Sequence, residues 1–126
     1  MKRLASLARV AELTADRAAF HLHVVEFVDE FRRRKDAGML VDEPRRLRAV
    51  YEGGDVADAY LAAVAVTLAR EIGAPPPAWA WDDSRKLATP WFAWPGPSLR
   101  ATLLAESPAA FRERNLFVSA NALSRA

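Results

Sequence analysis

The stretch DVADAYLAAVAVTLAREI, residues 55–72, decides the fold of this chain. It is rich in alanine and apolar on most of its helical surface, which is typical of a helix buried on several sides. Asp55 is a favoured residue type for a helix N-cap. Gly73 and the three prolines at 75–77 prevent continuation. We predict a central helix over 56–72.

The N-terminal segment, residues 3–35, has apolar residues at steps of three and four and contains no Gly or Pro. This pattern predicts helix throughout. Thr14 is a candidate internal N-cap, so the span is either one long helix or two in sequence. Basic residues at its end favour the helix dipole, and Gly38 is the expected stop.

Two further helical regions are predicted on either side of an irregular segment. Asp42-Glu43-Pro44 opens a short helix that runs to about Tyr51 and ends at Gly53-Gly54. Near the C-terminus, one short helix ends at about Glu106. Another starts with Ser107 as N-cap and Pro108 at the first helical position, and Asn115 ends it. Leu116-Phe117-Val118 is expected to be extended, with a last turn over 122–125.

Between these helices, residues 74–98 hold six of the eight prolines and all four tryptophans. We expect an irregular wrap with one helical turn around 84–87. Exposed tryptophan is costly, so the segment should lie against the helical core. Trp79 and Trp91 are predicted to close the core as a lid, and Trp81 and Trp94 to be candidate contacts for a protein partner.

Length and composition indicate one all-α domain over residues 1–126. Its expected parts are a helical core at 3–73, the Trp/Pro-rich wrap at 74–98 and short helices at 99–126. There is no cysteine, which excludes disulfides and thiolate metal sites and suits a reducing compartment. No signal peptide and no membrane-spanning stretch is recognisable. The expected location is cytoplasmic.

No catalytic constellation is recognisable, and no cofactor or metal is predicted. His21 and His23 lie two positions apart, so on a helix they point in different directions. His23 shares a face with Glu26 and Glu30, but this is a single weak ligand set. A small enzyme with its site near the two histidines stays an alternative. Asp82-Asp83 is interpreted as a cap for a short turn through Ser84.

Basic residues form clusters, although the net charge is only +2. A second alternative is a nucleic-acid-associated transcriptional regulator, because clustered arginines can bind phosphates. Its candidate residues are Arg32, Arg33, Arg34, Lys35, Arg45, Arg46 and Arg48. The competing interpretation is that the first four form a helix C-terminus and the others a solvated face.

The C-terminal part resembles an uncharacterised bacterial family. The residues that carry the resemblance are Pro77-Ala78-Trp79, Pro90-Trp91-Phe92, Leu99-Arg100-Ala101 and the run from Ser107 to Val118. This region, 77–126, is similar to the tail of some regulators encoded beside toxin–antitoxin genes. Those regulators also carry an N-terminal helix-turn-helix, which residues 1–60 do not show. The resemblance implies an antitoxin-like or accessory binding module.

These observations favour a non-enzymatic protein-interaction module, which binds a protein partner or forms a homodimer. Aromatic residues and arginines are enriched at the centres of protein interfaces. The candidate partner-binding residues are Trp81, Trp94, Phe111, Arg112 and Arg114.

Overall fold

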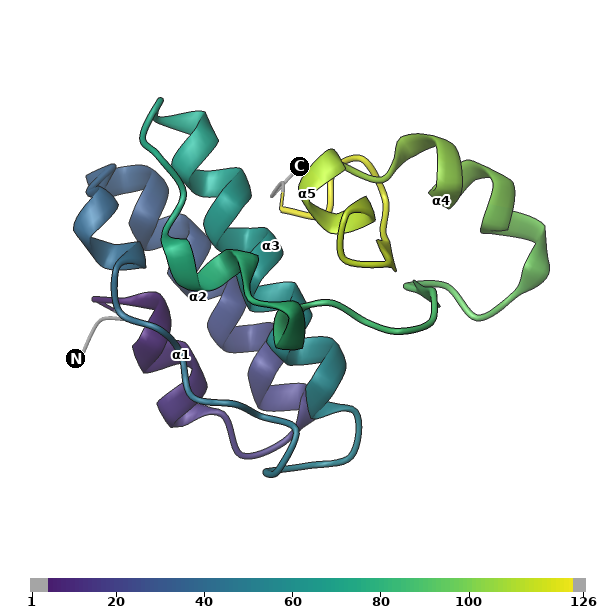
Figure 1. The fold of residues 1–126 in the computed structure, drawn as a ribbon, viewed down its shortest axis with the longest axis horizontal. Helices are drawn as coiled ribbons and strands as arrows, with labels where there is room; N and C mark the ends of the chain where they lie inside the picture. The colour runs from purple at the N-terminus through teal and green to yellow at the C-terminus, as the bar shows by residue number, and fades with distance from the viewer. Residues whose placement is uncertain (1–4, 124–126) are drawn as a thin grey trace.

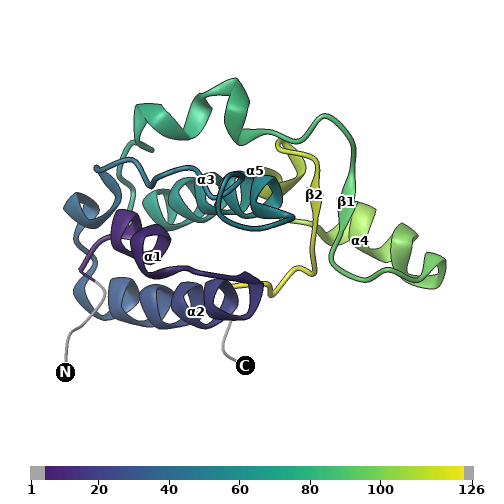
Figure 2. The same cartoon turned by 90° about the horizontal axis from the view of Figure 1, so that it is seen from below.

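The computed structural model describes residues 5–123. It confirms the all-α fold: five α-helices and several short 3-10 turns are joined by irregular segments, with one pair of two-residue strands (Figures 1 and 2). The elements, in chain order, are α1 (Leu7–Leu13), α2 (Arg17–Arg34), η1 (Ala37–Leu40), α3 (Gly54–Glu71), η2 (Ala78–Trp81), η3 (Asp83–Arg85), β1 (Trp91–Phe92), η4 (Pro97–Leu99), α4 (Arg100–Glu106), α5 (Ala109–Arg112) and β2 (Leu116–Phe117). None of the helices in this part of the chain has the length and apolarity to cross a membrane.

Helix α3 lies at the centre, as its composition predicts. In Figure 2 it runs between the layer of α1 and α2 on one side and the turns η2 and η3 on the other. Residues 61–66 are all buried, and α3 packs against α5, both of these turns and α2. Its N-cap is Gly53, with φ at 91°, rather than the predicted Asp55, which lies in the first turn. The many alanines of this helix let neighbouring elements approach it closely from several directions.

The N-terminal segment is two helices rather than one. The break follows Thr14, but Thr14 is not the cap of the second helix. Its hydroxyl donates to the carbonyl of Val10 at 2.7 Å, and Asp16 caps α2 by accepting from the Ala19 N–H at 2.8 Å. The predicted stop at Gly38 is also wrong, because α2 already ends at Arg34, and its C-cap Lys35 adopts the left-handed conformation with φ at 53°. Gly38 lies inside η1.

The predicted helix from Pro44 to Tyr51 is absent: residues 44–46 are irregular, and residues 47–51 form bends and turns. The Val50 and Tyr51 N–H groups donate to the Leu47 carbonyl at 2.9 and 3.4 Å, but other backbone groups of the segment bond to distant side chains. The Leu47 N–H donates to the Asp58 carboxylate at 2.6 Å, and the Pro44 carbonyl accepts from Arg85. Tertiary hydrogen bonds have therefore overridden a weak local preference for helix.

Residues 74–98 cover the core as a mostly irregular wrap. Trp79 packs against the core, and its indole N–H donates to the Leu40 carbonyl at 3.0 Å. Trp91 is also partly buried against the core, so the predicted lid is confirmed for both. The expected turn occurs slightly earlier than predicted, as η3, and Asp82 caps it by accepting from the Ser84 N–H at 2.9 Å.

The C-terminal part corrects one predicted helix and confirms the extended piece. Ser107 is not an N-cap; its hydroxyl donates to the Leu116 carbonyl at 3.0 Å and accepts from the Val118 N–H at 3.3 Å. The helix shrinks to α5, and Asn115, with φ at 62°, turns the chain into β2. Strands β1 and β2 pair in parallel, Trp91 with Leu116 and Phe92 with Phe117. The turn predicted at 122–125 lies partly outside the described residues.

Candidate functional site

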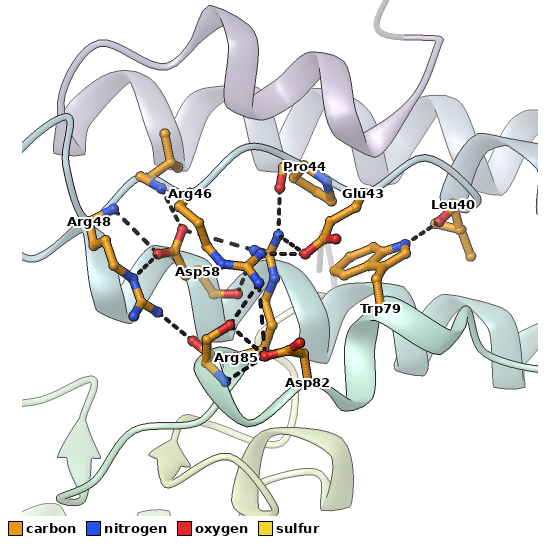
Figure 3. A network of polar contacts seen from close by, with 11 residues as sticks. Leu40, Glu43, Pro44, Arg46, Arg48, Asp58, Trp79, Asp82 and Arg85 are labelled. Carbon is orange, nitrogen blue, oxygen red and sulfur yellow. Dashed lines mark hydrogen bonds and ion pairs between the residues drawn. The ribbon is translucent and has the colours of Figure 1, made fainter.

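A network of arginines and carboxylates, buried at Asp58 and Arg85, ties the 43–48 segment to α3 and η3 (Figure 3). Its centre is Asp58, which is fully buried on α3. The Asp58 carboxylate accepts from the Leu47 N–H, from the Arg48 N–H at 3.3 Å and from Arg48 Nε at 2.9 Å. One side chain therefore replaces the backbone bonds that a helix would have made here.

Arg85 is the second buried member of this network. Its guanidinium donates to the Asp58 carbonyl at 3.2 Å and to Glu43 Oε2 at 3.1 Å, and it lies 4.9 Å from the centre of the Trp79 ring. Burial acts to lower the pKa of Arg85, yet an arginine stays charged at any accessible pH. Its buried Nε makes no hydrogen bond to the protein. The network therefore has a structural role, which depends on the carboxylates of both Asp58 and Glu43.

The carboxylate of Glu43 makes the contribution of this network to stability dependent on pH. Partial burial acts to raise the pKa of Glu43, but hydrogen bonds from Arg46 and Arg85 outweigh it, so the net pKa lies below 4.5. A depressed folded-state pKa contributes stability that is present above the unfolded pKa and is lost as pH falls through the folded value.

We therefore expect Glu43→Gln to lower the free energy of unfolding at pH 7 but to have progressively less effect below about pH 4.5, the ordinary carboxyl pKa. Urea unfolding of both proteins at a series of pH values measures this difference. A gap between the two curves that stays constant down to pH 2 would contradict the role assigned to Glu43. Asp83→Asn is the matched control, because the Asp83 side chain is fully exposed.

The two main basic clusters do not form one surface. The guanidinium of Arg45 donates to the carbonyls of Ala11 at 3.0 Å and Thr14 at 3.1 Å, so it lies at the end of α1 next to the start of α2. Residues 32–35 lie at the opposite end of α2, which has 18 residues and is therefore roughly 27 Å long. The fold separates the clusters that a phosphate-binding patch would have needed to combine.

Most of these arginines are also engaged within the molecule. Arg32 forms a bidentate pair with Glu71, at 3.2 and 2.7 Å, and Arg33 pairs with Glu30. Arg46 donates to Glu43 and to the Ser84 hydroxyl at 2.7 Å. Arg48 donates to the Ser84 carbonyl as well as to Asp58. These contacts give the basic residues a structural role and weaken the nucleic-acid interpretation.

The histidines lie apart, as their spacing predicts. His23 Nδ1 lies 3.4 Å from Glu26 Oε1 on the surface of α2, whereas His21 lies on the wall of a cavity between α2, α3 and the strand pair. Within residues 5–123, no three histidine or acidic side chains are grouped closely enough to hold a metal ion.

The predicted partner-binding residues divide into buried and exposed. Phe111 and Arg114 are in the core, with exposed fractions of 0% and 1%, so they are not contact residues and this prediction is corrected. Arg114 donates to the carbonyls of Ala110 and Ala80, both at 2.8 Å, and lies 5.1 Å from the centre of the Trp81 ring. Arg112 is exposed.

Trp81 and Trp94 are both exposed, at 45% and 54%. Trp81 is supported from beneath by Arg114. Trp94 belongs to a different feature, the segment 93–106, which we name the arm. In both Figure 1 and Figure 2, η4 and α4 of the arm project away from the body of the molecule.

The arm is anchored at few points. Leu103 is the only buried residue of α4, and Arg100 lies 5.0 Å from the centre of the Phe92 ring. The principal packing of α4 is against η4, which directly precedes it. The helix therefore leaves most of its surface in water, which is unusual for a helix of seven residues that has little stability of its own.

The outer face of the arm carries an apolar stripe, with the exposed Arg100 at its margin one helical turn before Leu104. Ala101, Leu104 and Ala105 are exposed and follow the spacing of one helical stripe. Trp94 and Leu99 extend this apolar surface toward the base of the arm, and the exposed fractions of Leu99 and Leu104 are 40% and 48%. An exposed apolar patch on a projecting element is the usual mark of a protein-interaction surface.

Comparison with known proteins identifies no relative, since no family model, no curated protein and no solved structure matches this chain. Sequence reasoning found Trp94 but missed Leu99, Leu104 and the two alanines of the arm. Their spacing indicated an apolar stripe on one face of a helix. Such a stripe predicts a buried face unless it is known that the helix projects from the body of the molecule.

Proposed function

We propose that this protein is a non-enzymatic protein-interaction module whose binding element is the arm, residues 93–106. The observation that carries the proposal is the exposed apolar stripe of Ala101, Leu104 and Ala105 on a helix that projects from the body. The resemblance of residues 77–126 to the tail of toxin–antitoxin-associated regulators supports an antitoxin-like or accessory role, because the arm lies within that region. The absence of cysteine suits a cytoplasmic location.

The partner we propose is a second copy of this chain. The stripe residues themselves carry no charge, and the flanking Arg100 lies over the Phe92 ring of its own chain. A two-fold axis places the same patch on both sides. Small residues on either side of Leu104 let two helices approach closely, with the leucines packed between them. Trp94 and Leu99 enlarge the contact at the base of each arm.

Sedimentation equilibrium tests this proposal. The arm is shorter than a standard interface, so we expect a weak dimer that forms between about 10 µM and about 1 mM protein. The apparent mass should rise with concentration from the monomer mass of 13.9 kDa. Leu104→Glu should hold the protein at the monomer mass, because it buries a charge between the two arms.

Val41→Glu is the control, because Val41 has an exposed fraction of 63% and lies outside the arm. It should dimerise as the natural protein does. A natural protein that stays monomeric to 1 mM would overturn self-association. If Val41→Glu and Leu104→Glu abolish the dimer equally, another surface forms it. If the protein stays monomeric but binds a different protein through the arm, and Leu104→Glu abolishes that binding, the different protein and not a second copy is the partner.

A further inference from the structure

A cavity of about 630 Å³ lies between α2, the start of α3, β1 with the beginning of the arm, and residues 118–122. It has the size of a small-molecule binding site. Five aromatic side chains line it: Phe20, Tyr51, Tyr60, Trp91 and Phe92. Phe20 and Tyr60 meet edge to face, with ring centres 5.9 Å apart. The body of the cavity is therefore built to contact a flat, apolar group.

The polar groups on this wall are neutral or cationic. Arg17 and His21 line the cavity, and no aspartate or glutamate does. Burial raises the pKa of Tyr60 to about 12, so its hydroxyl stays protonated and neutral at physiological pH. A negatively charged ligand would therefore meet no opposing carboxylate on the wall.

Arg17 is placed at the mouth of this cavity. A Cβ atom added to Gly53 would lie 3.8 Å from one of its guanidinium nitrogens, and Gly53 itself lines the cavity. Arg17 is the first residue of α2, where a positive charge opposes the helix dipole. Among the residues that the structure describes, none forms an ion pair with it. Asp16, next to it, accepts from the Ala19 N–H.

We propose that this cavity binds a small aromatic anion, with the ring packed against Phe20, Tyr60 and Trp91 and the acidic group at Arg17. This gives a role to Arg17, an exposed arginine with no ion pair to any described residue, at the helix end where its charge is unfavourable. The site is separate from the apolar stripe of the arm, so the two proposals succeed or fail independently.

Two fluorescent probes of similar shape test the site in the full chain. One is 8-anilinonaphthalene-1-sulfonate, which is an aromatic anion, and the other is N-phenyl-1-naphthylamine, which is uncharged. We expect saturable binding of both at one site. Arg17→Gln should weaken binding of the sulfonate about tenfold, the loss expected for one partly exposed charge contact, and leave the uncharged probe unchanged. Val56→Trp, which fills the cavity, should abolish binding of both.

Two controls exclude other sources of binding. Arg34→Gln removes the same charge from an exposed position at the far end of α2 and should not affect either probe. Leu104→Glu should bind both probes as the natural protein does, since the stripe of α4 does not line the cavity, although Ala93 and Pro95 at the base of the arm do. Equal losses in Arg17→Gln and Arg34→Gln, or unchanged binding in Arg17→Gln, would overturn the proposal. If circular dichroism shows that Val56→Trp does not fold, the comparison of Arg17→Gln with Arg34→Gln decides the question.

Discussion

Asp58→Ala should lower the free energy of unfolding by about 3–5 kcal/mol, the range found when one partner of a buried ion pair is removed. The Asp58 carboxylate is fully buried and accepts three hydrogen bonds from Leu47 and Arg48. Without it, Glu43 is the one acidic partner left to the buried guanidinium of Arg85 among residues 5–123. Urea unfolding monitored by far-UV circular dichroism measures the loss.

Asp83→Ala is the control for this prediction, since it removes a carboxylate whose side chain is fully exposed and should change stability by less than about 0.5 kcal/mol. Asp58→Asn keeps the shape and one acceptor oxygen, so its cost should fall between the two. A loss below about 1 kcal/mol for Asp58→Ala would mean that the network in Figure 3 does not hold the 43–48 segment.

Gly54→Ala should have a comparable or larger effect. A Cβ atom at Gly54 would lie 1.9 Å from the Leu47 carbonyl oxygen and 2.7 Å from the Arg48 nitrogen. These are backbone atoms of the segment that Asp58 holds, so no side-chain rotation relieves the overlap. We expect a loss of at least about 3 kcal/mol, beyond the usual range for an overpacked core site. The thermal midpoint should fall accordingly, or the protein should fail to fold.

Gly73→Ala separates this close approach from backbone strain. Gly73 has φ at 70°, and a Cβ atom there would meet nothing within 4 Å. Gly73→Ala should lower the free energy of unfolding only by the cost of the left-handed conformation, about 1–2 kcal/mol. If Gly54→Ala is no more destabilising than Gly73→Ala, the backbone at 47–48 is not packed against the start of α3 as described.

The sequence was sufficient to predict the central helix, because composition alone marks a buried helix. The predicted span of 56–72 and the observed Gly54–Glu71 differ by two residues at one end and one at the other. The sequence was not sufficient to predict the structure of residues 44–51. The hydrogen-bond acceptor for Leu47 is Asp58, eleven residues along the chain. No local pattern marks a side chain that bonds backbone groups at that distance.

The candidate site was predictable only in part, for a related reason. Trp94 was identified because tryptophan is costly to expose and is frequent at interfaces. Phe111 and Arg114 were chosen on the same grounds but are buried. An arginine gives no sign in sequence of whether it will meet water or, as Arg114 does, two backbone carbonyls. The direction of the arm depends on how β1 and β2 pair, which neither strand specifies alone.

Disulfide trapping tests the contact between two arms most directly, because the chain has no cysteine of its own. Ala101→Cys and Ala105→Cys, on the outer stripe of α4, should each form covalent dimers in a glutathione buffer. Adding Leu104→Glu to either variant should suppress them. Ala37→Cys, on the exposed part of η1, should stay monomeric under the same conditions. Cross-linking of the two arm variants no faster than that of Ala37→Cys would contradict self-association through the arm.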